Sequence, residues 1–218
     1  GEEQWRALFG TQAGGYLAPL VVEQGVYISS DSGSNGGMFG IHAGSGERLW
    51  AISNLGQHSN WTPSYANGKL YTHLGQSFCE RDLATGNARW CKTVPLTWQE
   101  MNTAPVIDQN SVLIVSDSDL RLLDLNAYAE PRWTRPGDFS STLPATAQGV
   151  VYALKNGSLE ALRSTDGGLL WSFSSPDLSD PLVHAPIITP DFVYVASSQT
   201  THVLHRATGL PVWQTDHG

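Results

Sequence analysis

Tryptophan recurs along this 218-residue chain at nearly regular intervals. Six tryptophans are separated by 45, 40, 43, 38 and 42 residues, and all but one of them follow a glycine by four positions. They are Trp5, Trp50, Trp90, Trp133, Trp171 and Trp213, and the glycines inside the complete repeats are Gly46, Gly86, Gly167 and Gly209. Ala129 takes the place of glycine before Trp133. A period near 40 residues indicates an array of similar units that bury their apolar faces against their neighbours.

Each repeat contains the signals of four short strands. In the repeat that ends at Trp90, a proline opens the segment 62–66, and Asn67-Gly68 is a strong two-residue hairpin signal. Residues 69–74, 77–82 and 87–91 then follow as three further strands, separated by glycine-containing turns. Four antiparallel strands in about 40 residues form one small twisted sheet, and radial stacking of such sheets is the β-propeller arrangement.

We therefore expect an all-β chain that forms a β-propeller of four-stranded antiparallel blades. It would contain five full repeats, at approximately 6–50, 51–90, 91–133, 134–171 and 172–213, preceded by one extra outer strand around Trp5. These repeats form a single propeller domain, or a fragment of one, over residues 1–218. The tryptophans are expected to be structural, each packing against the glycine turn of an adjacent blade.

The composition agrees with this fold and excludes some functions. Charged residues make up 15% of the chain, and glycine (22) and proline (12) are abundant, which is typical of a β-protein with many turns. The net charge is −8, so binding to a nucleic-acid backbone is not expected. The apolar runs have the length of strands, so we expect no membrane span in this chain.

Two segments carry a resemblance to a known family. Residues 82–90 and 205–213, each with Ala-Thr-Gly four positions before its tryptophan, resemble the pyrroloquinoline-quinone-type propeller repeat with its tryptophan-docking motif. The resemblance extends over essentially the whole chain. Propellers of that family usually close with seven or eight blades, so the resemblance implies that this chain is part of a larger propeller. A closed five-bladed ring is the alternative, and an open ring is expected to self-associate through its uncovered sheet face.

The resemblance does not transfer an enzymatic activity to this chain. Quinoprotein dehydrogenases of the family combine a calcium site, an aspartate base and often two adjacent cysteines, and no residue here matches these one to one. We therefore expect no cofactor, no metal ion and no catalytic residue. The loop at 31–36 has histidine, not glutamate, at the twelfth position of a calcium loop.

The two cysteines flank the turn at Thr85-Gly86. A symmetric hairpin would place Cys79 opposite Cys91 at bridging distance, whereas a shift of one residue would put them on opposite faces. The sequence leaves both alternatives open, a disulfide or two buried thiols. A bridge would imply an oxidising compartment.

Candidate binding residues lie in the segments that link the outer strand of one blade to the inner strand of the next. Such segments gather at the face of a propeller where ligands usually bind. The tryptophans outside the repeat pattern lie there, together with amide, acidic and imidazole groups. The candidates are Trp61, Trp98, Gln99, Glu100, Asn102 and His184. They suit a protein, peptide or saccharide partner. The alternative is that Trp61 and Trp98 fill apolar gaps between blades.

Together these features predict a non-enzymatic, periplasmic or extracellular propeller that acts as a protein- or ligand-binding scaffold, similar to the propeller lipoprotein of bacterial outer-membrane assembly. Two alternatives remain: a fragment of a quinone-dependent dehydrogenase, and a ligand-sensing ectodomain of a membrane protein.

Overall fold

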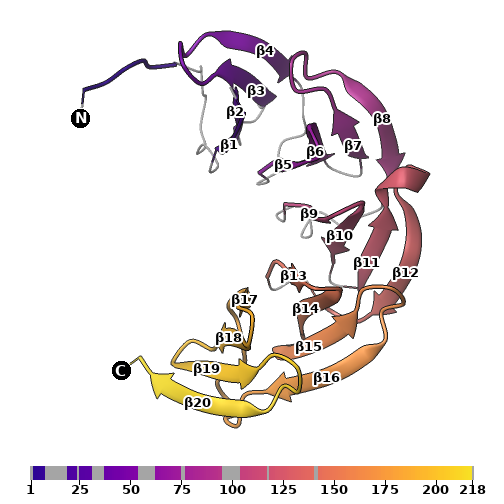
Figure 1. Ribbon diagram of the computed structural model, residues 1–218, viewed down its shortest axis with the longest axis vertical. Helices are drawn as coiled ribbons and strands as arrows, with labels where there is room; N and C mark the ends of the chain where they lie inside the picture. The colour runs from indigo at the N-terminus through magenta and orange to yellow at the C-terminus, as the bar shows by residue number, and fades with distance from the viewer. Residues whose placement is uncertain are drawn as a thin grey trace. The chain divides into compact units, whose positions relative to one another are not determined.

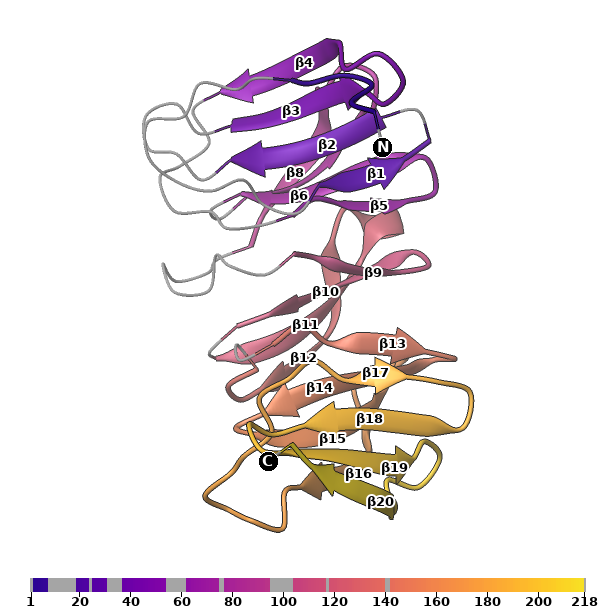
Figure 2. The same cartoon turned by 90° about the vertical axis from the view of Figure 1, so that its left-hand side faces the viewer.

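The computed structural model describes residues 2–7, 19–23, 25–30, 37–53, 62–74, 77–94, 104–116, 118–139 and 142–217. Within these ranges the regular structure consists of strands, apart from one 3-10 turn, η2 (Leu125–Ala127). The strands form five antiparallel sheets of four strands each, and in every sheet the strands lie side by side in chain order (Figures 1 and 2). The predicted all-β fold built from four-stranded blades is confirmed.

The strands follow the repeats closely. The first sheet contains β1 (Leu20–Val22), β2 (Gly25–Ser30), β3 (Gly37–His42) and β4 (Arg48–Ser53). The second contains β5 (Ser64–Ala66), β6 (Lys69–Leu74), β7 (Ser77–Arg81) and β8 (Ala88–Thr93). The third contains β9 (Val106–Asp108), β10 (Ser111–Val115), β11 (Asp119–Asp124) and β12 (Glu130–Pro136). The fourth contains β13 (Ala145–Ala147), β14 (Val150–Lys155), β15 (Ser158–Arg163) and β16 (Leu169–Ser174). The fifth contains β17 (Ile187–Ile188), β18 (Phe192–Ala196), β19 (Thr200–His205) and β20 (Pro211–Asp216).

The turns and strand ends explain this regularity. Asn67 and Gly68 have φ of 52° and 73°, the left-handed pair that a two-residue hairpin needs, as the sequence predicts. Each fourth strand runs three residues beyond its tryptophan. In every sheet the register shifts one residue before that tryptophan, which is a β-bulge. A bulge bends the strand and re-aims the next side chain.

Four tryptophan side chains make the same contact with the following repeat. In each, the indole Nε1 donates a hydrogen bond to the main-chain oxygen of the residue three positions before a glycine. The pairs are Trp5 with Ala43 (2.7 Å), Trp50 with Leu83 (2.8 Å), Trp133 with Ser164 (2.9 Å) and Trp171 with Arg206 (3.0 Å). Trp213 has the same position in β20 and is 49% exposed.

The glycines beneath these rings leave no space for a side chain. Their φ values are 70–71°, and a Cβ built on any of them would lie 2.5–2.9 Å from an indole carbon. The glycines are Gly46, Gly86, Gly167 and Gly209. Each indole therefore packs directly on a glycine, in a space that a larger residue could not share. That these tryptophan–glycine pairs raise the free energy of unfolding is a prediction.

The chain divides into two compact units, residues 1–109 and 110–218. The core of the first includes Tyr27, Met38, Trp50 and Leu70. The core of the second includes Tyr152, Leu154, Leu159 and Leu204, with Leu182 from the segment between β16 and β17. The second and third strands of the sheets supply most of these residues, whereas the fourth strand β16 alternates between half-buried and exposed.

The repeat with Ala129 departs locally from the others. There the turn before the tryptophan contains η2, and Tyr128 and Ala129 have φ of 52° and 59°. Ala129 is 1% exposed. The side chain of Asp124 accepts a hydrogen bond from the amide of Asn126, which caps this turn. Alanine therefore occupies a backbone conformation in which the other repeats have glycine.

Candidate binding face

One end of the sheets in residues 110–217 carries the predicted kind of binding segment. Because successive strands alternate in direction, the turn between the second and third strands lies at the same end as the segment that leaves the fourth strand. We call this the linker end; it is formed by residues 137–139, 156–157, 175–186 and 197–199. The other end, with the turns at 164–168 and 206–210, is the glycine-turn end.

Only part of the predicted site can be located. Trp61, Trp98, Gln99, Glu100 and Asn102 lie outside the described residues. His184 is exposed in the segment 175–186, and its amide donates a hydrogen bond to the main-chain oxygen of Ala196 (3.2 Å). The binding role of all six residues stays a prediction.

The segment 175–186 is held by a buried carboxylate. Asp180 is 7% exposed, and its side chain accepts hydrogen bonds from the Ser197 hydroxyl and from the amide of Ser198 (3.1 Å). Both partners lie in the turn between β18 and β19. A buried carboxylate needs such donors to offset its lost hydration. The segment is therefore tied to the fifth sheet at its centre.

Leu182 holds the same segment against the fourth sheet. Its side chain is 1% exposed and belongs to the core, and its amide donates to the main-chain oxygen of Gly157 (3.0 Å). The next amide, of Val183, donates to Ala196 (3.0 Å). Residues on either side of these anchors face solvent: Leu178 is 88% exposed and Val183 39%.

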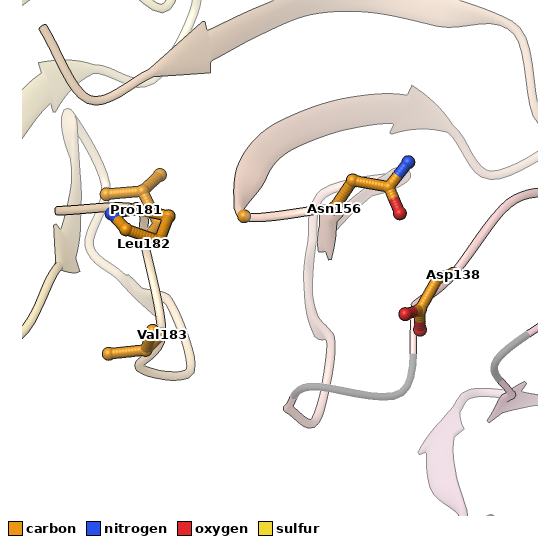
Figure 3. A pocket seen from close by; sticks show the side chains of 6 residues that line it. Asp138, Asn156, Pro181, Leu182 and Val183 are labelled. Atoms are coloured by element: carbon orange, nitrogen blue, oxygen red, sulfur yellow. The ribbon is translucent and has the colours of Figure 1, made fainter. Parts of the chain in front are cut away.

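A hollow of about 290 Å³ opens beside these anchors. Pro181, Leu182 and Val183 line one side of it, and Asn156 and Asp138 line the other (Figure 3). A second hollow of about 120 Å³ shares Asn156, Gly157 and Pro181 and continues to Ser174, Ser175, Asp177 and Leu178. Sequence reasoning named only His184 in this segment, although its three prolines and its Asp/Ser pairs signal an ordered loop.

Each hollow has an aspartate in its lining, Asp138 in the larger one and Asp177 in the smaller one. Lys155 lies close to Asp138, because its ammonium is 5.8 Å from the ring centre of the neighbouring Phe139. The hydroxyl and amide of Ser179 donate to Asp177 and hold the pKa of that carboxyl below its usual value. The five arginines of residues 110–218 each bind an acceptor elsewhere. The pairs are Arg121 with Asp119, Arg132 with Asp124, Arg135 with Glu160, Arg163 with Asp166, and Arg206 with Gln148.

His202 is a buried titratable group near this end of the fifth sheet. It is 3% exposed, its ring centre lies 5.2 Å from that of Phe173, and its Nε2 has no hydrogen-bond partner. Burial lowers the pKa of His202, and the charges of Asp180 and Asp216 oppose that shift. The folded state therefore favours a neutral imidazole.

Cys79 and Cys91 are joined in a disulfide in the second sheet. The register pairs the two residues directly across β7 and β8, with Cα atoms 4.1 Å apart and sulfurs 2.04 Å apart. The bulge begins one residue later, between Glu80 and Arg81, so it does not disturb this pair. Of the two alternatives that the sequence leaves open, the structure contains the bridged one.

Neither a metal cluster nor a membrane-spanning helix occurs in the described parts of the chain. No three His, Cys, Asp or Glu side chains there come together as ligands for an ion. No helix there is long and apolar enough to cross a bilayer.

The fold and the repeat define a β-propeller protein of the pyrroloquinoline-quinone-repeat class. Residues 1–173 match the family described as outer membrane protein assembly factor BamB, and the chain belongs to this family. The predicted family resemblance is thereby confirmed.

Solved structures agree on the fold. BamB from Moraxella catarrhalis superposes with a TM-score of 0.68 at 18% identity, over 88% of this chain and 61% of that one. The quinohemoprotein alcohol dehydrogenase ADHIIG from Pseudomonas putida HK5 superposes with a TM-score of 0.69 at 13% identity, over 91% and 41%. At such identities the likeness shows the fold alone.

A sequence relative points to another kind of protein. The serine/threonine-protein kinase AfsK of Streptomyces griseus is 27% identical over 207 residues, which cover 89% of this chain and 20% of the kinase. The chain thus spans about a fifth of that relative's length.

The buried imidazole predicts a loss of stability in acid. The unfolded chain binds a proton at His202 near the ordinary histidine pKa of about 6.5, whereas the folded state resists it. Below that pH the unfolded state holds more protons, so the free energy of unfolding falls as the pH falls. Replacing His202 by leucine should reduce the drop in melting temperature between about pH 7.5 and about pH 5, the range in which histidine titrates.

The matched control is His205→Leu, on the same strand but exposed. It should keep the pH dependence of the unmodified protein. An unchanged acid-induced drop in His202→Leu would contradict the assignment.

Proposed function

We propose that this chain is a non-enzymatic propeller that binds a protein partner outside the cytoplasm, at its linker end. The observation that carries the proposal is the family match over residues 1–173. The name of that family states a role in outer-membrane assembly, and we extend this role to the chain as a proposal. This chain covers 20–61% of the length of each of these relatives. The activity of a whole relative is therefore assigned to this chain only as a proposal.

The linker end supports a binding role physically. Its segment 175–186 is fixed by Asp180 and Leu182, yet it presents Leu178 and Val183 to water. Rigid display of apolar side chains is favourable for association, because little conformational entropy is lost when a partner covers them. Trp61 and Trp98 belong to equivalent segments, between β4 and β5 and between β8 and β9. We propose that these tryptophans, with Gln99, Glu100, Asn102 and His184, contact the partner.

The disulfide supports a periplasmic or extracellular location. Structural disulfides persist in oxidising compartments and are rare where thiols are kept reduced.

A ligand-sensing module is the second candidate. The kinase AfsK favours it, because the matching residues of this chain form propeller strands and make up only a fifth of that relative. In such a protein the propeller would recognise a signal and the remaining sequence would carry the catalytic activity. The dehydrogenase alternative has less support, since its structural likeness extends to the fold alone.

Thiol labelling in the native cells tests the location. A maleimide reagent should fail to label Cys79 or Cys91 when the cells are lysed in denaturant in the presence of the reagent; the denaturant is needed because Cys79 is only 1% exposed in the folded protein. Two sites should become reactive after reduction, because both sulfurs are joined in the folded protein. Labelling of both thiols before reduction would place the protein in a reducing compartment and contradict the proposal.

Capture from an envelope extract of the source organism tests the binding role. The immobilised chain should retain a defined protein, and the double variant Trp61→Ser with Trp98→Ser should retain it at least about tenfold less well, as loss of hot-spot tryptophans requires. The melting temperature should hardly change. The control Leu210→Ser, an exposed apolar residue at the glycine-turn end, should bind normally.

Two results would contradict the binding role. Equal retention of the partner by the double variant would show that Trp61 and Trp98 do not contribute to binding. A complex with pyrroloquinoline quinone and calcium, of roughly micromolar affinity or tighter, would favour the dehydrogenase alternative instead.

A further inference from the structure

Two identical dipeptides, Asn67-Gly68 and Asn156-Gly157, form the same turn in different surroundings. Each is a two-residue hairpin turn, with φ of 52° and 73° in the first and 50° and 75° in the second. Both asparagines are exposed. The two turns therefore present the same groups to water, and the residues around them differ.

An asparagine followed by glycine can lose its side-chain amide in water. The main-chain nitrogen of the glycine gives up its proton and attacks the asparagine Cγ, the Cγ–Nδ2 bond breaks, and the amide leaves as ammonia. The five-membered succinimide that results adds one water molecule and opens to aspartate or isoaspartate. Glycine favours the attack because no Cβ hinders its nitrogen. Water is the only co-reactant, and nothing is oxidised or reduced.

The folded turn opposes this reaction. In the left-handed conformation that both asparagines adopt, the glycine nitrogen points away from Cγ, so the turn must open before the ring can close. The rate of conversion then depends on how often each turn opens. Local opening is easiest where few contacts hold the backbone.

Three contacts hold the turn at Gly157. The amide of Leu182 donates a hydrogen bond to the main-chain oxygen of Gly157 (3.0 Å), and the amide of Asn156 donates to that of Asp138 (3.1 Å). Pro181 packs on the glycine, since a Cβ built there would lie 2.7 Å from the proline Cβ. Opening of this turn must disrupt contacts with two other segments of the chain.

The turn at Gly68 has weaker support among the described residues. Gly68 is exposed, and a Cβ built on it would meet no heavy atom within 4 Å beyond its chain neighbours. The Nδ2 of Asn67 donates to the main-chain oxygen of Gln109, in the turn between β9 and β10, at 3.4 Å. A hydrogen bond of this length is weak, so it opposes opening little.

We propose that Asn67 is a site of spontaneous conversion to aspartate and isoaspartate in the folded protein, and that the contacts of Leu182 and Pro181 protect Asn156. Conversion removes the Nδ2 donor and places a carboxylate beside the oxygen of Gln109. It therefore weakens the contact between the second and third sheets. The inference goes beyond the proposed binding function and does not depend on it.

Peptide mapping by mass spectrometry tests the proposal after incubation of the folded chain at mildly alkaline pH. Trypsin places the two asparagines in different peptides, residues 49–69 and 156–163. Asn67 should convert at least about tenfold faster than Asn156, because its turn opens more readily. A third dipeptide, Asn35-Gly36, lies outside the described residues and falls in a separate peptide, residues 7–48.

Unfolding in urea gives a control that needs no variant. Both turns are open there, so Asn67 and Asn156 should convert at rates within about threefold of each other. In the folded chain, Pro181→Gly should speed conversion of Asn156 at least about threefold and leave Asn67 unchanged. The matched control Pro190→Gly replaces another exposed proline of the same unit and should leave both rates unchanged.

Four outcomes would overturn the proposal. These are equal rates for the two asparagines in the folded chain, conversion of Asn67 only in urea, and no effect of Pro181→Gly on Asn156. The fourth is a tenfold difference that persists in urea, because the flanking sequence and not the fold would then be its cause. The measurement involves no binding partner, so each result leaves the proposed function as it stands.

Discussion

The hydrogen bond from a tryptophan Nε1 to a carbonyl of the next repeat, with the indole lying on a glycine, joins successive repeats within each compact unit. Among the described residues, four tryptophans make this bond, with donor–acceptor distances of 2.7–3.0 Å, always to the residue three positions before a glycine. A β-bulge lies one residue before Trp50, Trp133 and Trp171 and aims the ring in each case. The contact combines a hydrogen bond with the packing of a large apolar ring. It requires glycine, because the backbone φ is near 70° and a Cβ would overlap the ring.

This arrangement assigns different roles to the two ends of the sheets. The glycine-turn end is used by the packing of neighbouring repeats, so its turns keep one geometry, with the glycine amide bonded to the oxygen four residues earlier. The linker end carries no such constraint. There the segment 175–186 can be long, can be fixed by its own anchors, Asp180 and Leu182, and can display Leu178 to solvent. The fold itself occurs in proteins as different as an assembly factor and a dehydrogenase.

Much of the fold could be predicted from the sequence, because the signals are local and repeated. Asn67-Gly68 predicts its turn, and residues 69–74 are β6 as expected. The bulges could not be predicted, since they depend on pairing with a neighbouring strand. The disulfide could not be settled for the same reason: one residue of register decides whether Cys79 faces Cys91. The hollows were missed because they arise where Gly157 meets Pro181, two residues from different hairpins that no spacing rule connects. Of the six predicted binding residues, only His184 lies in a described part of the chain, where it is exposed as a linker residue should be.

A double-mutant cycle on Trp171 and Gly209 tests the central interaction most directly. A Cβ at Gly209 would lie 2.5 Å from the indole of Trp171, so Gly209→Ala should lower the free energy of unfolding through both its positive φ and this clash. In a Trp171→Ala background the φ contribution remains and the clash is gone. Denaturant unfolding of the four proteins should therefore give a coupling energy of at least about 1 kcal/mol, as residues in direct contact do. Additive effects, within about 0.5 kcal/mol, would contradict the account, because the ring and the glycine would then act independently.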